Sequence, residues 1–346
     1  MSALNDIALS GSSVSGLSGV SLAAGHDIDM SGASLNSAAA ISLIAGSSGT
    51  GAVNVGPEAA GGYAIDTAST LDITAADSIT VLGRIRALGN LSLYAGTDVQ
   101  LQGAEVVASA GNILLDADGS VLLTGSSVTA QTGSVAMSAL DDIALSAGSV
   151  SGLSVAMSAL NDIALSGSSV SGLSGVSLAA GHDIDMSGAS LNSAAAISLI
   201  AGSSGTGAVN VGPEAAGGYA IDTAATLDIT AADSITVSGR IRALGNVVMS
   251  SGDDIAFAGG SVNGAQTVSM SAGVDGSGSI LGSSLGGTDV FAAGPLTLSA
   301  ANAIGGGFAL VARVGGQATL LSPSIDAEVS ASPGGNPLIL SVSDIG

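Results

Sequence analysis

The chain has 346 residues and carries 27 acidic side chains against five basic ones, for a net charge of −22. Such an acidic surface excludes nucleic acid and anionic lipid as expected partners. No apolar run approaches the ~20 residues that a membrane-spanning helix needs, so membrane insertion is not expected. Aromatic residues make up only 2% of the chain, whereas glycine contributes 53 residues. We therefore expect an aliphatic interior in a chain that turns often.

The stretch Val20–Ala40, VSLAAGHDIDMSGASLNSAAA, contains three short segments in which apolar and polar residues alternate. Gly25 and Gly32 mark the corners between them, and alternation with period two predicts strands. A unit of this kind cannot bury its own apolar face, so it must stack on copies of itself. We predict an all-β chain that forms a right-handed parallel β-helix, the hand following from the usual preference of parallel crossovers.

The same stretch returns unchanged at Val176–Ala196, within a longer repeat that relates Met1–Asn90 to Met157–Asn246 at an offset of 156. The two differences are Ser69 against Ala225 and Leu82 against Ser238. The predicted coils begin at Val20, Ile41, Leu71, Leu91, Ile113, Val135, Val155, Val176, Ile197, Leu227, Val247, Val268, Leu296 and Leu320. These are about sixteen coils of roughly 20–30 residues. Residues 1–154 form the first copy of the seven-coil period, residues 155–267 a second, partial copy, and residues 268–346 less regular coils or a transition segment.

Two coils, Ile41–Thr70 and Ile197–Thr226, are longer than the others, and we expect their extra residues to bulge out as a loop. The loop holds polar residues that are candidates for binding a ligand: Asn54, Glu58, Tyr63 and Asp66, with the copies Asn210, Glu214, Tyr219 and Asp222. An exposed tyrosine ring can stack on the face of a sugar. The alternative, which we favour, is that the tyrosine packs the loop onto the coils.

An aspartate recurs before the second strand of many coils, at Asp6, Asp27, Asp98, Asp142, Asp162, Asp183 and Asp254. We expect these carboxylates to accept hydrogen bonds from backbone N–H groups at the corners. The alternative is that Asp142, Asp162 and Asp183, which lie in consecutive coils, bind Ca²⁺. Because the glycine-rich nonapeptide of calcium-binding β-rolls is absent, we expect no cofactor, with calcium as the open possibility.

Arg84 and Arg86 occupy alternate positions of one predicted strand, as do Arg240 and Arg242. They are expected to point outward and to pair with nearby carboxylates, Asp72 and Asp77 or Asp228 and Asp233. Polysaccharide lyases with a β-helix fold use a basic residue beside acidic ones, which keeps an enzyme open as an alternative. Duplication of the same group in a regular array argues against a single catalytic cleft, so we expect no enzyme.

The segments SLAAGHDIDMSGASLNSAAAISLIAG and SLYAGTDVQLQGAEVVASAGNILLDADG resemble the repeats of filamentous-haemagglutinin-like adhesins, large exoproteins of bacterial two-partner secretion. The resemblance implies a right-handed parallel β-helix shaft and export of the parent protein through an outer-membrane two-partner transporter. It also implies an extracellular, surface-associated location and adhesion to matrix polysaccharide or to host or bacterial surfaces. We expect the chain to be a shaft segment of a longer protein. The alternatives are a polysaccharide-processing enzyme and a self-assembling extracellular filament.

Overall fold

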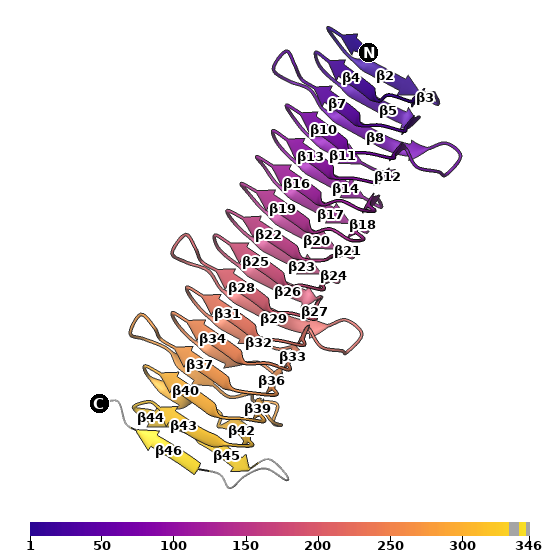
Figure 1. The fold of residues 1–346 in the computed structure, drawn as a ribbon. Coiled ribbons are helices and arrows are strands. Elements are labelled where there is room, and N and C mark those ends of the chain that lie inside the picture. Colours follow the sequence, from indigo (N-terminus) through magenta and orange to yellow (C-terminus); the bar gives the residue numbers. More distant parts are fainter. Residues whose placement is uncertain (332–338, 344–346) are drawn as a thin grey trace. The chain divides into compact units, whose positions relative to one another are not determined.

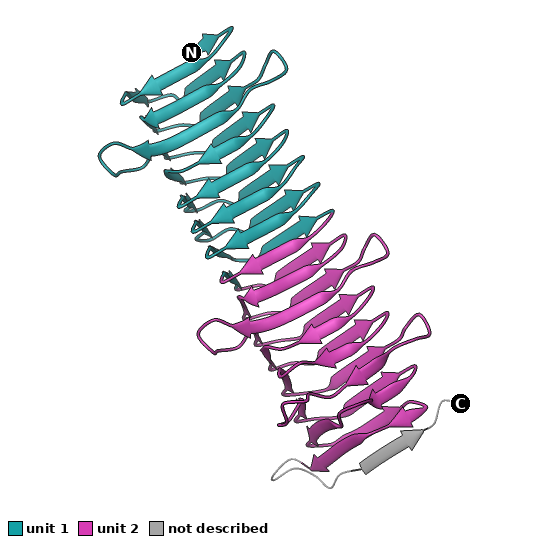
Figure 2. Ribbon diagram, turned by 180° about the vertical axis from the view of Figure 1, so that it is seen from behind, with its two compact units in different colours: residues 1–160, 168–172 teal, residues 161–167, 173–346 magenta. Residues whose placement is uncertain are grey.

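The computed structural model describes residues 1–331 and 339–343, which form strands and no helix. It follows that no described segment is a helix able to cross a membrane. The chain divides into two compact units, the first of residues 1–160 and 168–172 and the second of residues 161–167 and 173–346 (Figure 2). The end of the third predicted segment, residues 332–338 and 344–346, lies outside the described residues.

Three parallel sheets, which we name A, B and C, run through the described residues (Figure 1). Successive strands join A, B and C in turn, and the last described strand, β46, adds a sixteenth strand to sheet A. Apart from β25, β28 and β31, whose bounds are given below, the strands of sheet A are β1 (Ser2–Ala3), β4 (Val20–Ala24), β7 (Ile41–Ala45), β10 (Leu71–Ala75), β13 (Leu91–Ala95), β16 (Ile113–Ala117), β19 (Val135–Ala139), β22 (Val155–Ala159), β34 (Val247–Ser251), β37 (Val268–Ala272), β40 (Leu296–Ala300), β43 (Gln317–Leu321) and β46 (Ile339–Ser343).

Sheets B and C are built in the same way from the second and third strands of the coils. Sheet B contains β2 (Ile7–Ser10), β5 (Ile28–Gly32), β8 (Val53–Glu58), β11 (Ile79–Val81), β14 (Val99–Gln102), β17 (Val121–Thr124), β20 (Ile143–Ser146), β35 (Ile255–Phe257), β38 (Ser279–Leu281), β41 (Ala303–Gly305) and β44 (Ser324–Ile325). Sheet C contains β3 (Ser13–Gly16), β6 (Ser34–Ser37), β9 (Ile65–Thr67), β12 (Arg84–Ala87), β15 (Glu105–Ala108), β18 (Ser127–Ala130), β21 (Ser149–Gly152), β36 (Ser261–Gly264), β39 (Val290–Ala292), β42 (Leu310–Val314) and β45 (Ala327–Ala331).

The strands of the second copy, β23 to β33, have the bounds of β2 to β12 shifted by 156 residues and join the three sheets in the same rotation. They run from β23 (Ile163–Ser166) and β24 (Ser169–Gly172) through β25 (Val176–Ala180), β26 (Ile184–Gly188), β27 (Ser190–Ser193), β28 (Ile197–Ala201), β29 (Val209–Glu214), β30 (Ile221–Thr223), β31 (Leu227–Ala231) and β32 (Ile235–Val237) to β33 (Arg240–Ala243).

The core consists of ladders of aliphatic side chains, in which each inward residue stacks on the inward residue of the next coil. Leu71 of β10 pairs with Ile41 on one side and Leu91 on the other, and all three are at most 1% exposed. Along each strand, the residues that alternate with these inward residues point outward, so that buried and exposed positions alternate, as in β10. Burial of these ladders is the main favourable contribution to stability, at about 25 cal/mol per Å² of apolar surface.

The structure confirms the predicted all-β parallel solenoid of about sixteen coils, while its right-handed sense stays a prediction. The first strands begin where the alternation placed them, from Val20 to Leu296. The last predicted start is wrong, since β43 begins at Gln317 rather than Leu320. There Ala318 fills the inward position opposite Leu296, a place that a larger side chain holds in most coils.

The prediction of one bulging loop in each long coil also needs correction, because the extra residues divide between two loops (Figure 1). In the first copy, residues 46–52 connect β7 to β8 and residues 59–64 connect β8 to β9. Residues 273–278, between β37 and β38, form a loop like the one between β7 and β8, with the same Gly-x-x-Gly-x-Gly spacing. The sequence pattern alone does not predict this loop.

Candidate ligand-binding site

The loop after β8 is a tight turn that Glu58 holds closed. Its Oε2 accepts hydrogen bonds from the backbone N–H groups of Ala60, at 3.0 Å, and Gly62, at 2.7 Å. Gly61 lies between them with a φ of +79°, a conformation that a residue with a side chain rarely adopts. The predicted candidate Glu58 therefore shapes the loop.

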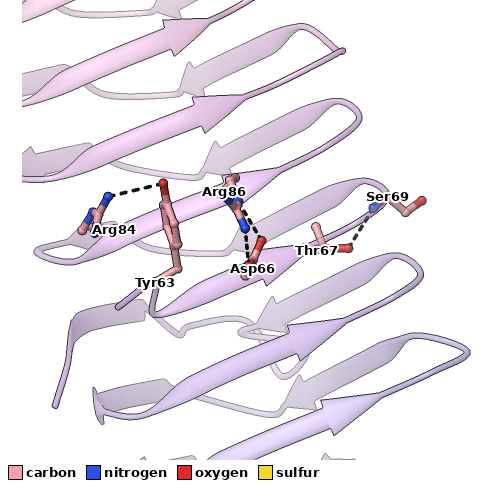
Figure 3. A network of polar contacts seen from close by, with 6 residues as sticks. All are labelled: Tyr63, Asp66, Thr67, Ser69, Arg84 and Arg86. Atoms are coloured by element: carbon pink, nitrogen blue, oxygen red, sulfur yellow. Dashed lines mark hydrogen bonds and ion pairs between the residues drawn. The ribbon is translucent and has the colours of Figure 1, made fainter. Parts of the chain in front are cut away.

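Tyr63 leaves this turn and lies against the next coil, where its ring sits between the guanidinium groups of Arg84 and Arg86 (Figure 3). The two guanidinium carbons are 4.4 and 4.5 Å from the ring centroid. The phenol oxygen also accepts a hydrogen bond from Arg84 at 3.3 Å. The ring packs the loop onto the coils, the favoured alternative, and both of its faces are in contact with arginine.

The two arginines are held in turn by carboxylates from the flanking coils. Asp66 pairs with Arg86 through two hydrogen bonds, 2.9 Å to Nε and 2.6 Å to a terminal nitrogen. Glu105 accepts from Nε of Arg84 at 2.6 Å. These hydrogen bonds raise the pKa of both guanidinium groups above the ordinary value, so both arginines stay charged.

The expected pairing of Arg84 and Arg86 with Asp72 and Asp77 is wrong. Asp72 lies on β10 of sheet A, whereas both arginines lie on β12 of sheet C. Asp77 accepts a hydrogen bond from the backbone N–H of Gly51 instead. The register between neighbouring coils identifies the true partners, because it places Arg86 beside Asp66 and Arg84 beside Glu105.

Asn54, the remaining candidate of the first copy, does not join this cluster. It lies on β8 in sheet B, exposed, and pairs in register with Thr80 and Asp29 of the neighbouring strands. The structure thus brings Tyr63 and Asp66 together through the arginines and leaves Asn54 on a different sheet.

The second copy repeats the cluster with one difference. Arg240 and Arg242 each lie 4.6 Å from the centroid of the Tyr219 ring, and Asp222 pairs with Arg242. Glu214 closes the same turn as its counterpart by accepting from Gly218, and Asn210 again lies in sheet B. Where the first copy has Glu105, the second has Ser261, and Arg240 forms no ion pair within the described residues. The predicted partners Asp228 and Asp233 are therefore wrong as well.

The recurring aspartates bind backbone, as expected, but their partners lie in the next coil rather than in their own turn. Oδ1 of Asp98 accepts from the backbone N–H of Ser120 at 2.9 Å, and Asp162 accepts from Asp183 in the same way. Asp183 accepts from Ala208. Among the described residues, no three acidic or histidine side chains are grouped so that they could hold a metal ion. Calcium binding at Asp142, Asp162 and Asp183, the alternative left open by the sequence, is not tested by the structure.

A groove of about 580 Å³ lies beside the tyrosine cluster, where sheet C ends and the chain turns back toward sheet A. It shares Asp66 and Arg86 with the cluster, and Leu17 and Leu88 stand along it. The groove could not be predicted from the sequence, because its residues lie 20 to 30 positions apart in the sequence and become neighbours only through stacking. Ligand sites commonly have volumes of about 300–1,000 Å³.

Stacked coils of three parallel strands, with side chains exposed along the outer ladders and short loops at the corners, define a repetitive β-solenoid of the kind that presents an extended surface. The family model of the hemagglutinin repeat matches residues 1–124 and 146–275, so the chain belongs to the hemagglutinin-repeat family. This family is a structural repeat of adhesins rather than a family of enzymes, and it is typical of secreted, surface-exposed proteins. The comparison with curated proteins and the comparison with solved structures gave no match.

Proposed function

We propose that the chain is a shaft segment of a secreted bacterial surface adhesin. The segment spaces or presents a binding tip and contributes to adhesion between cells, to surfaces or to matrix polysaccharide. The observation that carries the proposal is that the hemagglutinin-repeat model matches residues in both copies of the 156-residue repeat. The coils of both copies contribute strands to the same three parallel sheets. Stacking adds length with each coil and needs no catalytic cleft.

The arginines also support an adhesin over a polysaccharide-processing enzyme. A catalytic base needs a group within reach of a substrate proton. Arg84 and Arg86 are instead engaged with Glu105, Asp66 and the Tyr63 ring, and their pKa values are raised. We accordingly infer no enzymatic role. Extracellular location and export of the parent protein by an outer-membrane two-partner transporter belong to the same proposal.

Adhesion is tested with microspheres coated with the purified chain and applied, under flow, to bacterial cells and to surfaces coated with matrix polysaccharide. The proposal expects retention above that of spheres coated with an unrelated protein of similar negative charge. Equal retention of the two kinds of sphere on every surface would contradict it. Incubating the chain with candidate polysaccharides and measuring new reducing ends tests the inferred absence of catalysis.

A further inference from the structure

The groove beside the tyrosine cluster crosses five consecutive coils of the first unit. Its residues come from β3, β6, β9 and β12, from the residue directly after each of these strands, and from Ser109, just after β15. With neighbouring strands about 4.8 Å apart, the groove is roughly 19 Å long in the stacking direction. A groove of this length along a repetitive surface suits an extended polymer better than a compact small molecule.

One side of the groove is a ladder of polar side chains on the outer face of sheet C. Ser15, Asn36, Asp66 and Arg86 are paired in register, each in the coil after the previous one. Asn36 is exposed, and its amide forms no hydrogen bond to protein within the described residues. Arg86 uses Nε and one terminal nitrogen on Asp66, which leaves further N–H donors of its fork for a ligand.

The other side is formed by apolar residues at the corner after sheet C. Leu17 and Leu88 are 92% and 49% exposed, and the small residues Ala38 and Ala68 occupy the same corner position in the two coils between them. Large exposed leucines beside a hollow with polar donors can cover the C–H faces of a sugar ring while the polar ladder meets its hydroxyl groups.

The floor of the groove is held in place by two buried hydroxyl groups. Ser37 donates to the carbonyl of Gly16 at 2.9 Å, and Thr67 donates to the carbonyl of Ala39 at 2.6 Å. Both side chains are at most 3% exposed. Because each hydroxyl ties its corner to the previous coil, the groove is formed before a ligand arrives, which lowers the entropy cost of binding.

The charge of the groove identifies the class of polymer. Its lining has one carboxylate and one guanidinium, paired with each other, in a chain of net charge −22. A sulfated or phosphorylated polymer would meet repulsion from the net negative charge of the chain, and the one guanidinium of the lining is already paired with Asp66. A neutral chain rich in hydroxyl groups would meet donors, acceptors and apolar surface without that penalty.

We propose that this groove, with Asn36 and Arg86 as donors and Leu17 and Leu88 as flanking contacts, binds a neutral glycan chain along the stacking direction. The inference rests on the proposed adhesive function and names its ligand class and site. The lining residues recur 156 positions later, from Ser171 to Leu244, except that Ala265 stands where the first copy has Ser109.

The test is calorimetric titration of the purified chain with cellohexaose and chitohexaose, as neutral probes, and with a heparin hexasaccharide. One variant removes the free amides, Asn36→Ala with Asn192→Ala. A second variant, Ala68→Gln with Ala224→Gln, narrows the groove between the two leucines. Glutamine is accepted at this corner, since Gln131 already occupies the equivalent position. The matched control is Asn54→Ala with Asn210→Ala, which removes the exposed amide of Asn54 and the half-buried amide of Asn210 in sheet B.

We expect at least one neutral probe to bind the wild type, about tenfold weaker binding in both groove variants, and no change in the control. Unchanged melting temperatures show that the variants are folded. The groove assignment is overturned if only heparin binds, if neither neutral probe binds, or if the control loses as much affinity as the groove variants. The microsphere experiment distinguishes failure of the groove assignment from failure of the adhesive function. If spheres coated with the wild type and with the groove variants are retained equally, the groove assignment is wrong and the adhesive function stands. If spheres coated with the wild type are not retained, the adhesive function itself is contradicted.

Discussion

Arg84 and Glu105 lie side by side in consecutive coils, with 2.6 Å between Nε and the carboxylate, whereas the copy of this arginine, Arg240, lies beside Ser261. The two tyrosine loops therefore have the same sequence but different support. Glu105 fixes an arginine that in turn contacts the Tyr63 ring. Its absence leaves Arg240 held by Tyr219 alone within the described residues.

We predict that the loop after β29 exchanges its amide hydrogens several-fold faster than the loop after β8. The amides of Gly62 and Gly218, each bound to a glutamate at 2.7 Å, report the opening. Mass spectrometry distinguishes the copies when the peptides extend to Ser69 or Ala225, where the sequences differ.

Two substitutions exchange the environments of these loops. Glu105→Ser is expected to bring the first loop to the rate of the second, and Ser261→Glu to slow the second. Equal rates in the wild type, unaffected by either change, would show that the ion pair does not support the loop.

The buried carboxyl of Asp289 gives stability an unusual pH dependence. Asp289 is 2% exposed, and burial raises the pKa of its carboxyl above the ordinary value, although the backbone N–H of Val311 donates to it at 2.9 Å. The folded state thus holds this proton more tightly than the unfolded state. The resulting stability is complete below the unfolded pKa and is lost as pH rises through the folded pKa.

We therefore predict that the melting temperature of the wild type, relative to that of Asp289→Asn, increases as the pH is lowered from about 7 to about 4. The comparison cancels the titration of the other carboxylates, which the two proteins share. A constant difference across this range would mean that the carboxyl is not destabilised when ionised.

The aspartate ladder is predicted to stabilise the stack by accepting hydrogen bonds between coils. Asp98→Ala leaves the N–H of Ser120 without its acceptor, and we expect a loss of about 1 kcal/mol in the free energy of unfolding. Asp98→Asn keeps an acceptor oxygen and should lose less. Urea denaturation measures both variants.

Asp72→Ala serves as the control for this ladder, because Asp72 is exposed on sheet A and makes no side-chain hydrogen bond within the described residues. It is expected to change stability by less than about 0.5 kcal/mol. A comparable loss in all three variants would point to net charge rather than the specific hydrogen bond.

Calcium is predicted not to stabilise the chain. Ca²⁺ takes about six to eight oxygen ligands, whereas Asp162 and Asp183 each have Oδ1 on a backbone N–H group. The melting temperature should be the same with EDTA as with about 1 mM CaCl₂, the range in which extracellular calcium modules are loaded. A calcium-dependent rise that disappears in Asp162→Ala would reveal a site that these hydrogen bonds do not exclude.

The sequence was most informative where structure depends on a single coil. Alternation placed the first strand of nearly every coil, because an inward residue is apolar whatever lies above it. It failed at β43, where Ala318 takes the inward position. The candidate site was harder to predict, because Asp66 and Arg86 are adjacent only through stacking. The residues could be proposed from the sequence, but their partners required the register between coils.

The offset of 156 residues between the two copies has a consequence for how such a chain changes over generations. Each strand from β2 to β12 corresponds to a strand from β23 to β33 with the same bounds. Unequal recombination between the two copies of the gene would join a coil to its equivalent and add or delete seven whole coils. Every strand would keep its alternation of apolar and polar residues. The shaft would therefore lengthen or shorten in a single genetic event, without an intermediate that contains an incomplete coil.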